Sequence, residues 1–194
     1  MATARSESFE SKDIFQKEKG RKVLVDNKIF LIGFMGVGKT TQGRSIAWKM
    51  KRKFIDMDEE VKRRVGMSIG EYFDKYGEES FRQIESEVLQ KFEKRNEALI
   101  ISTGGGLVIK EENRKILKSH SQVVWLRAKS HTIQSHLESS YIRRPLLEVE
   151  DPISAISQKL EEREAFYTEV ATLIIDVDDK TQEEVESLLL LKLI

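Results

Sequence analysis

The sequence contains no cysteine and only two prolines in 194 residues. The absence of cysteine excludes disulfides, thiolate metal sites and cysteine nucleophiles, and it fits a reducing compartment. The sequence also lacks net charge, because 33 lysines and arginines balance 33 aspartates and glutamates. A neutral chain has no global field that attracts nucleic acid or an anionic membrane, and no apolar run approaches the roughly 20 residues of a membrane span. We therefore expect a cytoplasmic protein without nucleic-acid or membrane partners, and we take it to be a monomer.

The first segment, residues 1–27, mixes acidic and basic side chains, and its longest apolar run covers only residues 23–25. This is not the pattern of a secretory signal, and organellar transit peptides are usually poor in acids. We expect a solvated tail or a short extension there. The remaining length suits one domain, which we place at residues 28–194.

Short apolar runs alternate with longer amphipathic stretches from residue 28 onward, which is typical of parallel βα units. The apolar runs are residues 29–32, 54–55, 99–101, 123–126 and 173–175. Helical spacing occurs in residues 40–52, 59–64, 77–94, 111–118, 130–139, 152–167 and 181–191. Strands that are apolar throughout are covered on both faces. The sequence therefore predicts an α/β three-layer sandwich with a five-stranded parallel sheet.

A phosphate-binding motif follows the first predicted strand. Residues 33–40 read Gly-Phe-Met-Gly-Val-Gly-Lys-Thr, which matches G-x-x-x-x-G-K-[ST] between a strand and a helix. Its glycines allow backbone N–H groups to point at phosphate oxygens, and the helix N-terminus adds a positive end. The expected nucleotide-binding residues are Gly36, Val37, Gly38, Lys39, Thr40 and Thr41. The motif predicts nucleotide binding, with Lys39 on the β- and γ-phosphates and Thr40 on Mg²⁺.

Three further patterns concern the acceptor of the phosphate. Asp56 and Asp58 end the second predicted strand, and strand periodicity puts both side chains on one face, where they could serve as a magnesium ligand and a base. The alternative is that the two aspartates cap the next helix. Arg82 and Glu85 are i, i+3 neighbours, for which a surface ion pair is the default interpretation. Residues 102–106 read Ser-Thr-Gly-Gly-Gly, and three glycines let a ligand or another backbone segment approach closely.

These motifs, followed by Arg144-Pro145-Leu146-Leu147 and by Arg163 with Tyr167, occur in an order and at spacings similar to those of shikimate kinases. The resemblance covers about residues 29–176. It implies a nucleoside monophosphate kinase-like P-loop fold and ATP-dependent phosphorylation of the shikimate 3-hydroxyl, a step of aromatic amino acid biosynthesis. It also implies a lid near residues 139–149. The alternatives are a gluconate-type small-molecule kinase and a catalytically silent shikimate kinase-like protein.

The resemblance also implies a role for each matching residue. Asp58, Lys39 and Arg144 would be catalytic, with Asp58 as the base and Arg144 arriving on the nucleotide. Thr40 and Asp56 would hold Mg²⁺, with Ser102 in its water shell. Shikimate would contact Asp58, Arg82, Gly104, Gly105, Gly106, Arg163 and Phe81.

One position departs from the family. Seven residues before Arg144, many members place an arginine that stacks on adenine, whereas this chain has Leu137. We expect Leu137 to cover the adenine less effectively, so that ATP binds more weakly and Leu137→Arg restores affinity. The two tryptophans, Trp48 in a helix and Trp125 in a strand, are both expected in the core.

Overall fold

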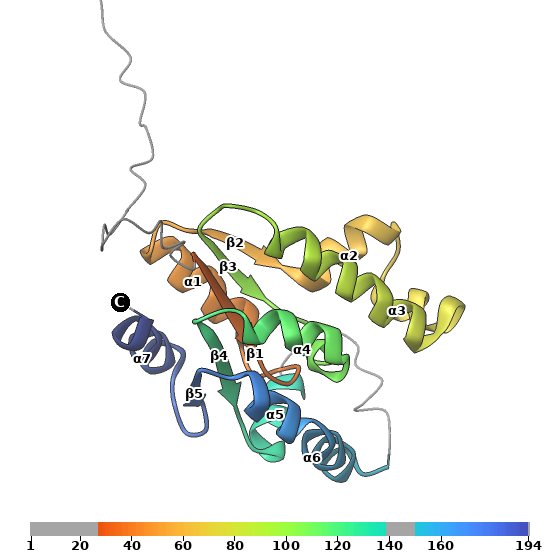
Figure 1. The fold of residues 1–194 in the computed structure, drawn as a ribbon. Helices are drawn as coiled ribbons and strands as arrows, with labels where there is room; N and C mark the ends of the chain where they lie inside the picture. Colours follow the sequence, from red (N-terminus) through yellow and green to blue (C-terminus); the bar gives the residue numbers. More distant parts are fainter. Residues whose placement is uncertain (1–26, 139–149, 194) are drawn as a thin grey trace, which may run out of the picture.

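The computed structural model describes residues 27–138 and 150–193 and contains a five-stranded parallel sheet with helices on both sides (Figure 1). The strands lie in the order β2-β3-β1-β4-β5. They are β1 (Lys28–Ile32), β2 (Lys53–Asp56), β3 (Leu99–Ser102), β4 (Val123–Arg127) and β5 (Leu173–Asp176). Every apolar run predicted as a strand lies within one of them, which confirms the predicted sheet and fold class.

Alternate residues of β1 pack into two different cores. Phe30 and Ile32 belong to the core under α3, α4 and the end of α6, whereas Ile29 and Leu31 belong to the core under α1 and α7. Successive side chains of a strand point to opposite faces. All residues of β1 are buried for this reason, and the central strand gives the three-layer arrangement seen in Figure 1.

The helices match the predicted stretches with one substantial difference. They are α1 (Lys39–Lys49), α2 (Met57–Val65), α3 (Ile69–Glu93), α4 (Glu111–Lys118), α5 (Ser130–Glu138), α6 (Pro152–Val170) and α7 (Gln182–Leu193), with a short 3₁₀ helix η1 (Leu107–Ile109). Helix α3 begins eight residues before the predicted start at Gly77, because Ser68 and Glu71 form a capping box there. Gly77 has φ 77° and marks a kink inside α3.

Trp48 contradicts the prediction that it lies in the core. Its side chain is 81% exposed, whereas Trp125 is 4% exposed as expected. Helix α1 buries Gly43, Ile46 and Ala47. With 3.6 residues per turn, Trp48 lies roughly 150° around the helix from the middle of that stripe. Trp48 therefore lies on the solvent-facing side of α1, although it stands within a helical apolar pattern in the sequence.

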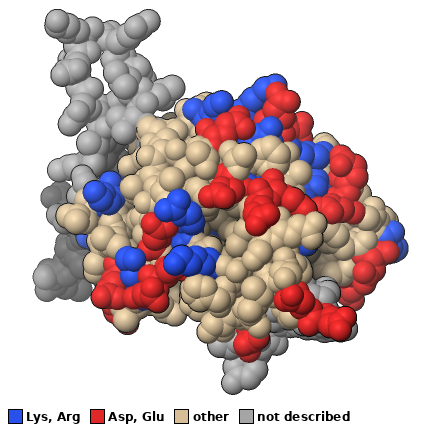
Figure 2. Space-filling view, turned by 90° about the horizontal axis from the view of Figure 1, so that it is seen from below, with Lys and Arg blue, Asp and Glu red and all other residues tan. Residues whose placement is uncertain are grey.

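The carboxyl ends of all five strands meet at one edge of the sheet, because all pairings are parallel. Ligands of open α/β sheets bind at this edge. On the face of the molecule in Figure 2, acidic and basic side chains are interspersed. None of the helices in the described residues is long and apolar enough to cross a membrane. The proposed boundary at residue 27 and the lid near residues 139–149 involve segments outside those residues and stay predictions.

Candidate active site

The phosphate-binding loop connects β1 to α1 and requires glycine for two reasons. Gly33, Gly36 and Gly38 all have positive φ, a region that other residues enter at a steric cost. A methyl group added at Gly33 would also overlap the carbonyl of Leu126. The loop therefore passes directly against the end of β4, with Gly38 as the N-cap of α1.

Lys39 folds back over this loop. Its side chain is buried, and Nζ donates hydrogen bonds to the carbonyl oxygens of Gly33 and Phe34, both at 2.7 Å. The ammonium group is thus held above the loop and beside the positive end of α1. This concentrates positive charge where the backbone N–H groups of the loop can receive phosphate oxygens.

Three oxygen-bearing side chains meet beside Lys39. The Thr40 hydroxyl donates to Asp56 Oδ2 at 2.7 Å and lies 3.4 Å from Ser102 Oγ. They come from the first turn of α1 and from the carboxyl ends of β2 and β3, at the same edge of the sheet. Hard oxygen donors with one carboxylate are the set that Mg²⁺ accepts when phosphates supply further ligands.

Asp58 reaches the site by a different route from the one predicted. Strand β2 ends at Asp56, and Asp58 lies in the first turn of α2, so the two carboxylates do not share a strand face. Asp56 Oδ1 accepts from the N–H groups of Asp58 at 3.0 Å and Glu59 at 3.3 Å, which makes Asp56 the N-cap. The capping interpretation is thus correct for Asp56, and the same residue still contacts Thr40.

Asp58 nevertheless lies beside the three glycines. A methyl group built on Gly104 would lie 3.0 Å from Asp58 Oδ1 and would overlap the Glu85 carboxylate. A side chain at position 104 is therefore excluded by two acids. Asp58 and Glu85 are close enough that the Asp58 charge contributes to raising the pKa of Glu85.

Arg82 and Glu85 form a buried ion pair and not the surface pair that their spacing suggests by default. Its side chain is 10% exposed and that of Glu85 is 2% exposed, and Nη1 donates to Glu85 Oε2 at 2.5 Å. A second carboxylate, Glu78, accepts from Nη2 at 2.8 Å. Burial raises the pKa of Glu85 to about 7, although the Arg82 guanidinium opposes the shift. A methyl group at Gly106 would overlap this guanidinium, so position 106 has to be glycine for Arg82 to lie there.

A second buried arginine, Arg163, contacts the same run of glycines. Arg163, on α6, is 8% exposed, and its guanidinium lies 5.4 Å from the centroid of the Phe34 ring. Nη1 donates to the Gly105 carbonyl at 3.4 Å, and the Tyr167 hydroxyl donates to the same oxygen at 2.6 Å. Arg163 Nε is buried and has no hydrogen-bond partner among residues 27–138 and 150–193. A ligand that supplies a hydrogen-bond acceptor to such an unpaired buried donor is bound more tightly.

A comparison with protein families agrees with this geometry. The family model for shikimate kinase matches residues 35–193, which is most of the chain. The chain belongs to the shikimate kinase family. The resemblance drawn from the sequence is therefore confirmed.

Relatives and solved structures of shikimate kinases support the assignment over most of the chain. The shikimate kinase of Enterococcus faecalis is 40% identical over 158 residues, which cover 81% of this chain and 92% of that protein. That of Caldanaerobacter subterraneus subsp. tengcongensis is 43% identical over 157 residues, with coverages of 81% and 90%. The structure of the Acinetobacter baumannii shikimate kinase in complex with shikimate has a TM-score of 0.78 at 36% identity, with coverages of 86% and 92%. A gluconokinase from Sinorhizobium meliloti matches at a TM-score of 0.53 and 18% identity, which is a likeness of fold alone.

Leu137 is a core residue of this structure. It is 2% exposed and belongs to the core that contains Ile133 and Val37. A methyl group at Gly36 would lie 2.9 Å from Leu137 Cδ2. Leu137 therefore packs beneath the phosphate-binding loop. A side chain with 2% exposure leaves little surface that could cover an adenine, contrary to the expectation from the sequence. Its helix, α5, also contacts the loop through His136 Nδ1, 2.9 Å from the Gly36 oxygen.

Three predicted site residues of this shikimate kinase family member remain, namely Phe81, Thr41 and Arg144. Phe81 is 3% exposed and lies 4.5 Å from the Phe73 ring and 5.4 Å from the Arg82 guanidinium, so it packs beneath that arginine. Thr41 is exposed in the first turn of α1. Arg144 lies outside the described residues.

Sequence reasoning gave no role to Glu78 or Tyr167. Glu78 stands four residues before Arg82, a spacing at which helical side chains meet, so its contact was detectable from the sequence. The Tyr167 contact crosses from α6 to the loop after β3, and no local spacing indicates it. Long-range partners of this kind require the fold.

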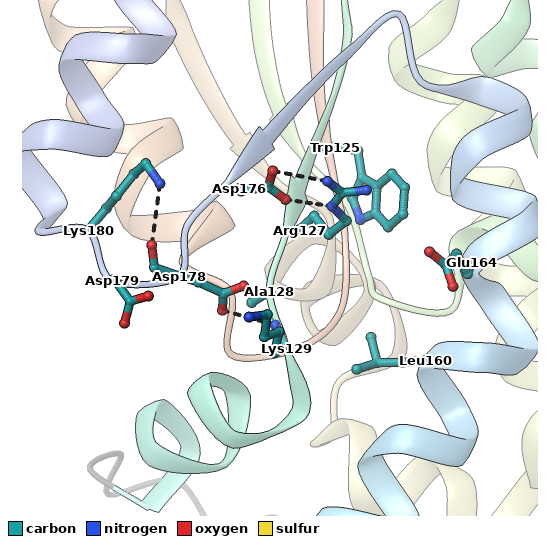
Figure 3. A pocket seen from close by; sticks show the side chains of 10 residues that line it. All are labelled: Trp125, Arg127, Ala128, Lys129, Leu160, Glu164, Asp176, Asp178, Asp179 and Lys180. Atoms are coloured by element: carbon teal, nitrogen blue, oxygen red, sulfur yellow. Dashed lines mark hydrogen bonds and ion pairs between the residues drawn. The ribbon is translucent and has the colours of Figure 1, made fainter.

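A separate pocket lies at the outer edge of the sheet, between the ends of β4 and β5 and helix α6 (Figure 3). Its lining residues are Trp125, Arg127, Ala128, Lys129, Leu160, Glu164, Asp176, Asp178, Asp179 and Lys180. Arg127 and Asp176 form a bidentate pair with N–O distances of 2.5 and 2.9 Å, and Asp178 accepts from the Lys129 backbone N–H. Much of the charge in this pocket is thus neutralised internally, and the predicted site residues within the described ranges lie elsewhere.

Proposed function

We propose that this protein transfers the γ-phosphoryl group of ATP to the 3-hydroxyl of shikimate, as a step of aromatic amino acid biosynthesis. The observation that carries the proposal is the pair of buried arginines, Arg82 and Arg163, beside the glycines after β3. One of them keeps a buried N–H with no acceptor in the described part of the chain. A planar guanidinium fork matches a carboxylate, and the family's acceptor carries one.

The acceptor side of the proposed site consists of these arginines, the glycines and one acid. Gly104, Gly105 and Gly106 bring backbone close to the ring of the acceptor, while Phe81 supports Arg82 from below. Asp58, next to Gly104, is proposed to accept the proton of the 3-hydroxyl as it attacks. The hydroxyl oxygen forms a bond to the γ-phosphorus, the bond to the β,γ-bridging oxygen breaks, and ADP leaves.

The nucleotide side is the loop between β1 and α1. The backbone N–H groups from Gly36 to Thr41 are proposed to bind the phosphates, and Lys39 is proposed to exchange its two carbonyl acceptors for β- and γ-phosphate oxygens. Both carbonyl acceptors belong to the loop itself, so the lysine side chain already lies over the loop that would receive the phosphates. Arg144 is assigned to the transferred phosphoryl group on the family resemblance alone.

Magnesium is the cation that the Thr40, Asp56 and Ser102 oxygens fit best, because it prefers hard oxygen ligands and retains water and phosphate ligands. When bound with ATP it supplies charge neutralisation at the β- and γ-phosphates. Thr40 and Asp56 would hold it. Ser102, whose hydroxyl lies 3.4 Å from that of Thr40, would contact its water shell. Cytoplasmic location and a monomeric state stay predictions of this proposal.

The function is tested with an ADP-release assay coupled to NADH oxidation, run with shikimate, with gluconate and without an acceptor. We expect acceptor-dependent turnover with shikimate only. Turnover with gluconate would indicate a gluconate-type kinase, and no turnover with either acceptor would indicate a silent relative. Either result contradicts the proposal.

Two variants separate the two sides of the site. Asp58→Asn should nearly abolish transfer but leave ATP affinity within about threefold, because Asp58 serves the acceptor hydroxyl. Lys39→Met should weaken ATP binding as well as transfer. Calorimetric titration with ATP reports both affinities. Equal losses of ATP affinity in the two variants would remove Asp58 from the acceptor side.

A further inference from the structure

The Tyr167 hydroxyl and Arg163 contact the same backbone oxygen, that of Gly105. The Tyr167 O–H donates at 2.6 Å and Arg163 Nη1 at 3.4 Å. The two side chains lie one turn apart on α6 and project to the same side. The shorter bond belongs to tyrosine, so tyrosine is the stronger constraint on the carbonyl group.

The tyrosine ring is itself immobilised. Tyr167 is 1% exposed, and its ring is stacked on Trp125 of β4 with centroids 5.3 Å apart. Burial raises the pKa of the Tyr167 hydroxyl, so the group remains a hydrogen-bond donor throughout the pH range of ordinary assays. The tyrosine donor is therefore held against strand β4.

Gly105 joins the two halves of the proposed site. A methyl group built on Gly105 would lie 3.1 Å from the Met35 nitrogen and 3.4 Å from the Gly33 oxygen, so this residue packs directly on the phosphate-binding loop. Its neighbours, Gly104 and Gly106, face Asp58 and Arg82 respectively. The orientation of the peptide after Gly105 thus affects the acceptor glycines and the arginine that donates to its carbonyl.

We propose that Tyr167 is a positioning residue for the acceptor: its hydroxyl fixes the Gly105 carbonyl, and through it the placement of Arg163 and the glycines 104–106 relative to the phosphate-binding loop. This inference rests on the proposed function. Tyr167 does not itself contact the acceptor. It affects the binding of shikimate because its hydroxyl holds the carbonyl of Gly105, one of the three glycines proposed to line the shikimate site.

The test is Tyr167→Phe, which removes the hydroxyl and keeps the stacked ring. Leaving a carbonyl without its main donor should raise the KM for shikimate about 5- to 100-fold, while kcat and the KM for ATP stay within about threefold. A matched control is Thr172→Val, which removes a hydroxyl bonded to the β4 backbone at the opposite edge of the sheet. It should lower the melting temperature and leave both KM values unchanged.

The two kinds of failure are distinguishable. An unmodified protein that does not phosphorylate shikimate would refute the proposed function. An active unmodified protein together with an unchanged shikimate KM in Tyr167→Phe would refute the positioning role, and so would equal rises of both KM values. If Tyr167→Phe does not fold, Trp125→Phe loosens the same ring while keeping the hydroxyl, and it must show the same selective rise in the shikimate KM or the role is refuted.

Discussion

Gly106→Ala isolates the contribution of Arg82 without touching the arginine. Gly106 has φ −101° and ψ 1°, a conformation open to alanine, so the backbone tolerates the change. The added methyl group overlaps the Arg82 guanidinium, the mobile end of a long side chain. Arg82 must therefore swing away from Glu85, and the fold should survive.

The size of the effect follows from what Arg82 loses. A hydrogen bond to a charged group contributes about 1.5–3 kcal/mol. At about 1.4 kcal/mol per factor of ten, losing one such bond to the acceptor carboxylate raises the KM for shikimate by about 10- to 150-fold. The KM for ATP should change by less than about twofold, because Gly106 and Arg82 lie on the acceptor side.

The control for this prediction is Gly70→Ala. Gly70 lies in α3, the helix that carries Arg82, and a methyl group there meets nothing within 4 Å. Steady-state kinetics with varied shikimate and varied ATP, combined with thermal melts, give all the required quantities. If Gly106→Ala remained folded with the KM for shikimate of Gly70→Ala, the assignment of Arg82 to the acceptor would be refuted.

Two further predictions concern buried groups. Glu85 has a pKa of about 7 in the fold against an ordinary value of 4.5; the folded state therefore holds a proton that the unfolded chain releases between these values. Its contribution to the free energy of unfolding should fall by on the order of 2–3 kcal/mol as the pH rises through this window. In calorimetric melts from pH 5 to 8, the stability of Glu85→Gln should therefore decline less than that of the parent. Equal slopes of stability against pH would contradict the assignment. Leu137→Ala should destabilise the fold by about 2–5 kcal/mol by leaving a cavity under Gly36. Leu137→Arg should lower the melting temperature rather than tighten ATP binding, and tighter ATP binding in a variant as stable as the parent would show that this side chain faces the nucleotide.

The sequence alone was sufficient for features that contiguous residues encode. The apolar runs of the five strands and the spacing of Gly33, Gly38 and Lys39 describe local backbone geometry, which depends little on distant residues. The strand, the loop and helix α1 were therefore predicted with nearly correct bounds. The order of motifs was enough to identify the family, because the spacings between them are set by the lengths of the βα units.

Only the tertiary structure decided which side chains are buried and which distant groups meet. Arg82 and Glu85 form a pair that is indistinguishable by spacing from a surface ion pair, and Trp48 and Leu137 both stand in helical patterns, yet Trp48 faces outward and Leu137 packs beneath Gly36. The contact of Tyr167 with Gly105 spans 62 residues of chain. Burial and such contacts depend on which elements pack against a face, and that information belongs to the whole fold because no single segment determines its own neighbours.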